Sequence, residues 1–159
     1  MKVCIVVHSK TGTTLKFAEK IMKELRDRKH RVELVGLEIE PPDWQGRPKD
    51  GKEFEIKNLP DCSPHDAVII GCPVWGASAT PIIIKAISDV KGLSGKKVVP
   101  FSTQSFPFSF LGGNRTLRMI GREAEKKGAK VLPGSNVCKM FHDVSKKMEE
   151  GARDVASRL

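Results

Sequence analysis

Residues 3–7 read Val-Cys-Ile-Val-Val and lead, through His8, into Ser9-Lys10-Thr11-Gly12-Thr13-Thr14. The first segment is short, apolar and rich in β-branched side chains, which indicates a buried parallel strand over residues 2–8. A hydroxyl-rich loop follows, and residues 13–28 repeat apolar side chains at helical spacing. A strand, a loop and a helix in this order direct backbone N–H groups and a helix N-terminus at one point, which indicates an anion site.

The residue types of this loop suit a phosphate group. Gly12 can adopt a positive φ, so the chain can curl until successive N–H groups converge. Ser9, Thr11, Thr13 and Thr14 offer hydroxyls to phosphate oxygens, and Lys10 adds a positive charge. The pattern is neither G-x-x-x-x-G-K-[ST] nor G-x-G-x-x-G, which argues against a P-loop nucleotide hydrolase and a dinucleotide-binding turn. An ordinary turn with threonine caps remains the alternative.

Length and composition favour one cytoplasmic domain. The chain has 159 residues, so we expect a single domain over residues 1–159. No stretch approaches the ~18 apolar residues of a membrane span, and the apolar run after Lys2 is too short for a signal peptide. The four cysteines (positions 4, 62, 72 and 138) form no C-x-x-C pair or zinc spacing, and the four histidines are scattered. The spacing therefore predicts no metal site.

Positive charge is concentrated in the second half of the chain. The formal net charge is +9, and residues 81–159 hold 15 of the 28 Lys and Arg but 7 of the 19 Asp and Glu. Such an imbalance indicates an acidic partner or an anionic ligand, with charge that serves only solubility as the alternative. The chain has no helix-turn-helix, zinc finger or aromatic RNP-type run, so we do not expect nucleic acid as a partner.

Strands and helices alternate along most of the remaining chain. Thr80-Pro81 marks a helix start, with proline at the first helical position and Ile83, Ile84 and Ile87 directed inward. Gly128 ends a later helix, and Pro133-Gly134 interrupts the last strand. We predict strands over 31–37, 67–71, 96–102 and 130–137, and helices from 80 onward, over 114–127 and from 143 to the end.

Residues 38–66 differ from the other connections because they carry several prolines and glycines and no helical pattern. We expect no regular helix in this segment. A short extended piece over 53–57 is predicted instead, and its neighbouring apolar side chains should cover one face of the sheet. These side chains are Trp44, Phe54, Ile56 and Leu59.

The alternation predicts a doubly wound α/β sheet with crossovers of one hand. Ligands of such sheets bind beyond the carboxyl ends of the strands, where the strand order reverses. Three loops follow predicted strands, at residues 9–14, 72–79 and 103–113. We therefore expect these three loops to converge on one site.

Together the three loops resemble those of the flavodoxin family, in its short-chain form. Residues 9–14 match the family's phosphate loop [ST]-x-T-G-x-T at every fixed position. Gly71-Cys72-Pro73-Val74-Trp75-Gly76, with Pro81 further on, resembles the second flavin loop, and residues 103–113 take the place of the third. The resemblance implies a five-stranded parallel sheet of order 2-1-3-4-5, with helices on both faces and FMN as the cofactor.

By this resemblance, Trp75 would stack on the flavin ring, and the Gly76 peptide would be free to turn its carbonyl toward the ring. The chain has no tyrosine to cover the other face of the ring, and we choose Phe106 for that place, with Phe108 and Phe110 as alternatives. No catalytic or metal-binding residue is assigned. The implied cofactor-binding residues are Ser9, Lys10, Thr11, Gly12, Thr13, Thr14, Pro73, Val74, Trp75, Gly76, Thr103, Gln104, Phe106 and Gly113.

Three functions stay open on the sequence. The first is a one-electron carrier between redox partner proteins that have an acidic docking surface. Arg115, Arg118 and Arg122 share one helix face, which would contact such a partner or the phosphate of a pyridine nucleotide, with a merely solvated face as the alternative. The second is an FMN-dependent NAD(P)H oxidoreductase acting on a quinone or a similar acceptor, with a pocket shaped in part by Trp44. The third is a module of this fold without a cofactor. The resemblance favours the electron carrier over the enzyme.

Overall fold

A parallel sheet forms the centre of the computed structural model, which describes residues 1–45, 53–106, 108–140 and 143–159. Its strands follow the order β2-β1-β5-β7-β8, and β9 pairs with β7 beyond β8. All of these strands are parallel to one another. Their bounds are β1 Lys2–Val7, β2 Arg31–Gly36, β5 Ala67–Trp75, β7 Lys97–Gln104, β8 Lys130–Val131 and β9 Ser135–Cys138.

This order is the predicted 2-1-3-4-5, because β8 and β9 are two parts of the predicted fifth strand. The interruption falls at Pro133-Gly134, as the sequence indicates. Gly134 lies so close to β7 that a side chain there would overlap the Pro100 carbonyl. The strand therefore continues past a point where the backbones approach too closely for regular pairing.

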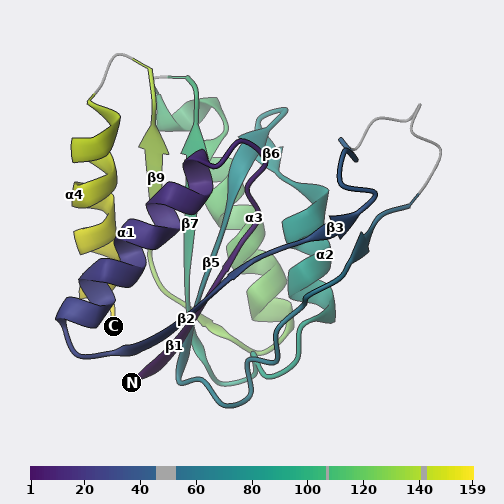
Figure 1. Ribbon diagram of the computed structural model, residues 1–159, viewed down its shortest axis with the longest axis vertical. Helices are drawn as coiled ribbons and strands as arrows, with labels where there is room; N and C mark the ends of the chain where they lie inside the picture. Colours follow the sequence, from purple (N-terminus) through teal and green to yellow (C-terminus); the bar gives the residue numbers. More distant parts are fainter. Residues whose placement is uncertain (46–52, 107, 141–142) are drawn as a thin grey trace.

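Helices cover both faces of the sheet (Figure 1). Helices α1 (Thr13–Asp27) and α4 (Val144–Ser157) lie on one face, and α2 (Pro81–Asp89) and α3 (Gly113–Lys126) lie on the other. Alternate residues of β1 divide between the two cores, since Val3, Ile5 and Val7 face α1 and α4 while Cys4 and Val6 face the opposite side. Among the described residues, none of the helices combines the length and the apolar character that a membrane span requires.

The sequence signals for the start of α2 and for the end of α3 are confirmed in the structure. The Thr80 hydroxyl accepts a hydrogen bond from the Ile83 amide, and Pro81 is the first residue of α2. Gly128 follows α3 with a φ of 84°. The inward face of α2 is partly mispredicted, because Ile82 is fully buried whereas Ile84 is only half-buried.

The third predicted strand is longer than its sequence pattern suggests. Residues 72–75 were expected in a loop but belong to β5, which stays paired with β7 as far as Pro73 opposite Thr103. Beyond that point Val74 and Trp75 pair with β6 (Ser78–Ala79) in a tight antiparallel hairpin. Pairing with the neighbouring strand causes this extension, which the local sequence pattern does not indicate.

The connection between β2 and β5 contains no helix in its described residues, as expected. It forms a small antiparallel pair, β3 (Ile39–Glu40) with β4 (Glu55–Ile56). The Trp44 and Phe54 rings contact each other with centroids 4.3 Å apart. The predicted cover of the sheet is confirmed, since the four apolar side chains named for it, Trp44, Phe54, Ile56 and Leu59, all pack against the core on the α2 and α3 face.

Candidate functional site

The loop after β1 forms a cradle of unpaired backbone donors at the carboxyl edge of the sheet, the edge where the parallel strands end. Gly12 has a φ of 90°, as predicted, and its N–H donates to the Ser9 hydroxyl at 3.1 Å. The N–H groups of Thr11, Thr13, Thr14 and Leu15 have no hydrogen-bond partner among the described residues. A side chain added at Gly12 would meet no atom of the described residues within 4 Å, so the loop is open at Gly12. Unpaired donors at the start of a 15-residue helix suit an anion.

The hairpin of β5 and β6 lies next to this loop. Gly76 and Ala77 form its turn, with φ values of 54° and 62°, as a type I′ turn requires. Trp75 directly precedes the turn and is half-buried. The Lys10 ammonium lies 5.9 Å from the centroid of the Trp75 ring, within the range of a cation–π contact. The first and second loops therefore meet.

The loop after β7 joins both of the others. The hydroxyls of Thr103 and Thr14 are buried and hydrogen bonded to each other at 2.8 Å. On the other side, a side chain at Gly112 would lie 2.7 Å from the Ala77 Cα and 2.8 Å from a Val74 methyl group. The expected convergence of the three loops is therefore observed.

Two of the sequence-predicted residues of the third loop hold it in shape. The buried amide of Gln104 donates to the carbonyls of Phe106, at 3.0 Å, and Phe108, at 2.7 Å. Its oxygen accepts from Asn136 on β9 at 3.0 Å. Gly113 leaves room for this pair, because a side chain there would overlap both amides. Thr103 and Gln104 belong to β7 itself rather than to the loop in which they were expected.

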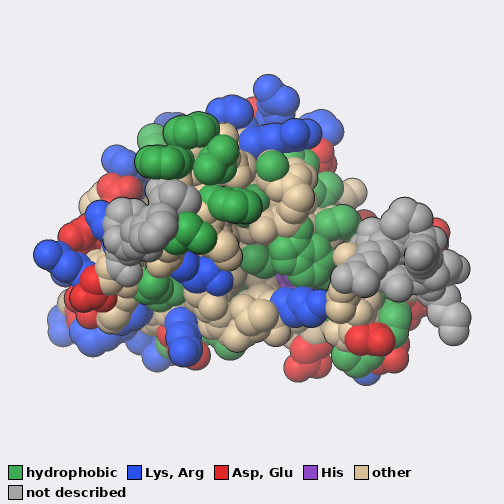
Figure 2. Space-filling model, turned by 90° about the horizontal axis from the view of Figure 1, so that it is seen from above, with side chains coloured by type: hydrophobic (Ala, Val, Ile, Leu, Met, Phe, Trp, Pro, Cys, Tyr) green, Lys and Arg blue, Asp and Glu red, His purple; other side chains and the backbone are tan. Residues whose placement is uncertain are grey.

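The third loop also presents an exposed apolar patch. Phe106, Phe108 and Phe110 expose 57%, 55% and 74% of their surfaces, and the last two rings stack with centroids 5.3 Å apart. Figure 2, which looks down on the carboxyl edge, shows apolar side chains gathered on this face with Lys and Arg around its rim. Exposed aromatic side chains beside a candidate site indicate a surface for docking or for covering a ligand.

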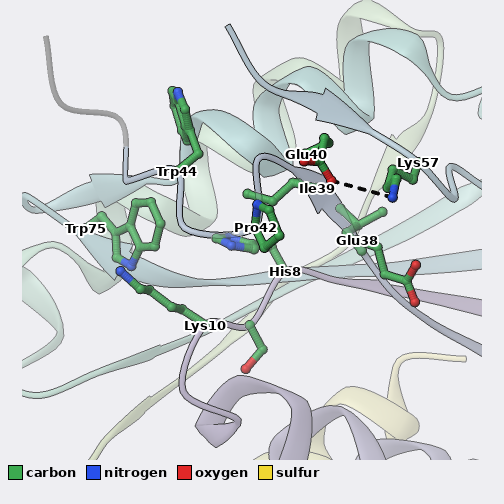
Figure 3. A pocket seen from close by; sticks show the side chains of 11 residues that line it. His8, Lys10, Glu38, Ile39, Glu40, Pro42, Trp44, Lys57 and Trp75 are labelled. Carbon is green, nitrogen blue, oxygen red and sulfur yellow. Dashed lines mark ion pairs between the residues drawn. The ribbon is translucent and has the colours of Figure 1, made fainter. Parts of the chain in front are cut away.

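A pocket of about 370 Å³ opens beside Trp75, between the first loop and the connection that follows β2. Figure 3 shows Lys10 extending toward the Trp75 indole, which forms part of the wall together with Trp44. Lys57 also lines the pocket and forms an ion pair with Glu40 at 3.5 Å. The pocket therefore combines two indoles with cationic and anionic groups.

His8 lines this pocket and was missed by the sequence reasoning. It is 4% exposed, its Nδ1 lies 2.9 Å from the Thr80 hydroxyl, and its ring meets Trp75 edge-on at 5.1 Å. Burial, with a smaller contribution from Lys10, lowers the pKa of His8 from 6.5 to about 4. The imidazole is therefore neutral near pH 7. The sequence feature that could have identified His8 is its position directly after the strand at residues 3–7.

Basic side chains flank the first loop. A groove of about 560 Å³ between α1 and α4 is lined by four lysines, Lys16, Lys20, Lys23 and Lys139, and by Glu19. Two of these lysines form ion pairs, Lys20 with Glu149 and Lys23 with Asp27. Arg115, Arg118 and Arg122 are all exposed on α3, as their spacing predicts. The electrostatic field around this edge therefore favours anions.

Comparison with solved structures assigns the fold. The chain matches a flavodoxin from Streptococcus pneumonia TIGR4 at 17% identity and a TM-score of 0.67, over 100% of each chain. It matches flavodoxin 2 from Bacillus cereus at 18% identity, again with a TM-score of 0.67 over 100% of each chain. It also matches the rubredoxin oxygen:oxidoreductase from Desulfovibrio gigas at 16% identity and a TM-score of 0.63, covering 99% of this chain and 35% of that one.

No protein-family model and no curated protein matches the sequence. The chain therefore has the flavodoxin fold, and the likeness lies in the structure rather than in the overall sequence.

Proposed function

We propose that this protein binds FMN at the carboxyl edge of its sheet and carries electrons between partner proteins. The observation that carries the proposal is the set of N–H groups at Thr11, Thr13, Thr14 and Leu15, which have no partner in the described part of the chain and lie beside an indole. Such donors suit a terminal phosphate, and Trp75 offers a flat apolar surface within reach of the same loop. The flavodoxin fold supports the same cofactor.

FMN would supply a ring that accepts and releases electrons. The residues of this chain would position it and control its surroundings. The N–H groups of the first loop would hold the phosphate, and the Thr11 hydroxyl, which is exposed, would add one donor. Trp75 would shield the ring from water. Gly76 would let its peptide change orientation, because glycine tolerates both signs of φ.

An electron carrier fits the surface around this site. The patch of Phe106, Phe108 and Phe110 offers an apolar contact area next to the proposed flavin site. Arg115, Arg118 and Arg122 add positive charge on the helix that follows. A partner with acidic side chains around an apolar centre would complement both features.

A second candidate is an FMN-dependent NAD(P)H oxidoreductase that reduces a quinone or a similar acceptor. The pocket of about 370 Å³ beside Trp75 favours it, because it has room for part of a second molecule and contains Lys10 and Lys57. Anaerobic mixing of the FMN-loaded protein with NADPH separates the two functions. An electron carrier stays yellow without a reductase, whereas the enzyme is bleached rapidly.

Titration of FMN with the cofactor-free protein, followed by flavin fluorescence, tests the proposed site. We expect saturable 1:1 binding, weakened by ~1.5–3 kcal/mol in Thr11→Val, the value of a hydrogen bond to a charged group. Thr11→Ser keeps the hydroxyl and is the matched control, with affinity near that of the wild type. Equal affinity of the valine variant and the wild type would contradict a phosphate contact at Thr11. Absence of any binding would favour a module without a cofactor.

A further inference from the structure

A cluster of Cys4, Glu33, Cys62 and His65 lies near the amino ends of β1 and β5, away from the three loops. Cys4 and Glu33 are register partners on β1 and β2, and the other two residues lie in the segment that leads into β5. One ligand atom each of Cys4, Glu33 and His65 lies within 4.8 Å of the other two. Within the cluster, His65 Nε2 is 2.8 Å from a Glu33 oxygen. The Cys62 thiol lies outside this group of three but next to Cys4, and together with burial it raises the pKa of the Cys4 thiol.

The backbone holds the Cys62-Ser63-Pro64-His65 turn in a fixed shape. The His65 N–H donates to the Cys62 carbonyl at 3.0 Å, and the Cys62 N–H donates to the Lys91 carbonyl at 2.9 Å. The Lys96 ammonium also donates to the Ser63 carbonyl at 3.0 Å. The backbone positions of Cys62 and His65, at the two ends of this turn, are therefore fixed before any ligand binds.

Burial leaves the cluster closed on one side and open on the other. Cys4 and Cys62 are 0% exposed and His65 is 7% exposed, whereas the Glu33 side chain is 55% exposed. Both cysteines are free thiols. An ion would enter past the Glu33 carboxylate, which lies at the edge strand of the sheet.

We propose that these four side chains bind one Zn²⁺ ion, through the sulfur atoms of Cys4 and Cys62, Nε2 of His65 and a carboxylate oxygen of Glu33. Two thiolates, one imidazole and one carboxylate form a four-ligand set that suits this borderline-soft ion. Binding would draw the Cys62 sulfur to the other three ligand atoms and would replace the contact between His65 and Glu33. The thiol protons, and any proton on His65 Nε2, would be released to solvent.

The place of the cluster in the fold suggests its role. The connection between β2 and β5 has no helix in its described residues. A zinc ion would tie the end of this connection to β1 and β2 at once, and would stabilise the folded chain by binding it in preference to the unfolded one. This inference does not depend on FMN binding at the opposite edge.

Cobalt(II) is the probe for the test, because it occupies zinc sites and reports their ligands by absorption. Reduced, metal-stripped protein is titrated with Co²⁺ and then with Zn²⁺. We expect one Co²⁺ per chain, a thiolate charge-transfer band in the near ultraviolet, strong visible bands of tetrahedral cobalt, and loss of all bands when Zn²⁺ is added. Folded wild-type protein without these bands would overturn the proposal.

Variants assign the bands to the cluster. Cys62→Ser should abolish the charge-transfer band or reduce it to that of one thiolate, and Cys72→Ser is the matched control, since Cys72 is also fully buried but lies outside the cluster. Glu33→Gln changes an exposed side chain, so it leaves the fold intact, and should weaken Co²⁺ binding at least about tenfold. Bands that persist unchanged in Cys62→Ser, or unchanged affinity in Glu33→Gln, would contradict the assignment.

Discussion

His8 carries the most unusual electrostatic environment among the residues that line the pocket. The ring lies between Trp75 and Thr80, and the nearby Lys10 ammonium adds to the cost of protonating it. A buried neutral histidine links stability to pH, because the unfolded chain takes up a proton at a higher pH than the folded one does. The same environment presents a neutral ring to the pocket at physiological pH.

We predict that His8 makes the protein less stable as the pH falls from about 6.5 to about 4. In this window the unfolded imidazole is protonated while the folded one is not, so the free energy of unfolding decreases by up to about 3 kcal/mol and then levels off. Urea unfolding of the wild type and of His8→Asn at several pH values measures this effect. On acidification the wild type should lose more unfolding free energy than the variant does. A difference between the two proteins that does not change with pH would contradict the assigned environment.

The buried hydroxyl pair of Thr14 and Thr103 gives a second prediction at this scale. Thr14→Val leaves the Thr103 hydroxyl buried without its partner, which should cost about 1–3 kcal/mol of unfolding free energy. Replacing both residues with valine removes both polar groups and should restore most of that loss. A double-mutant cycle from chemical unfolding checks this coupling, and strictly additive losses would show that the two hydroxyls do not depend on each other.

The single elements show how far the sequence alone can lead. The strand at residues 3–7, the cap at Thr80-Pro81 and the break at Pro133-Gly134 are encoded by adjacent residues, and each appears where it was predicted. The extension of β5 to Trp75 could not be predicted, because it depends on pairing with β7 and β6.

The candidate sites, too, were predictable only where their residues are adjacent in the sequence. The first loop is one continuous motif, so its residues were found together. Cys4, Glu33 and the Cys62–His65 turn meet only after the strands pair, so their proximity has no signature in the sequence, whose spacing predicts no metal site. His8 was overlooked because a single histidine at a strand end resembles many others in sequence. Local chemistry is readable along the chain, whereas clusters assembled by the sheet are not.

The contact between α1 and α4 depends on Gly151, and this yields a prediction for the element scale. A side chain at Gly151 would lie 2.8 Å from the tip of the buried Phe17 ring. Gly151→Ala should therefore cost about 1–3 kcal/mol from overpacking, despite the ~1 kcal/mol by which alanine favours a helix. Gly121→Ala in α3 is the comparison, because its new methyl group meets Val131 at 3.2 Å. Thermal unfolding should show the larger loss for Gly151→Ala, and the reverse order would contradict the packing described.

The molecule as a whole combines a net charge of +9 with an exposed apolar patch at one edge. Charge of this size steers anions over distances comparable with the Debye length and is weakened by salt. The arginine face of α3 lies on the helix that begins directly after the third loop. The proposed electron transfer to anionic partners should therefore be faster at low ionic strength.

We predict that oxidation of the reduced, FMN-loaded protein by hexacyanoferrate(III) slows as salt is added. Replacing Arg115, Arg118 and Arg122 with glutamine should lower the rate at low salt severalfold and flatten the salt dependence, because steering by these charges is lost. The control replaces the exposed residues Arg28, Lys29 and Arg31 with glutamine, which removes the same charge near the amino ends of the strands. Stopped-flow absorbance gives the rates. Equal effects of the two triple variants would show that only net charge matters.

A crystal structure of the chain grown with FMN tests the central claim most directly. We predict the phosphate within hydrogen-bond distance of the N–H groups of Thr11, Thr13, Thr14 and Leu15, and the flavin ring against Trp75, enclosed by the three loops. FMN bound elsewhere, or a phosphate that leaves those N–H groups unpaired, would contradict the account.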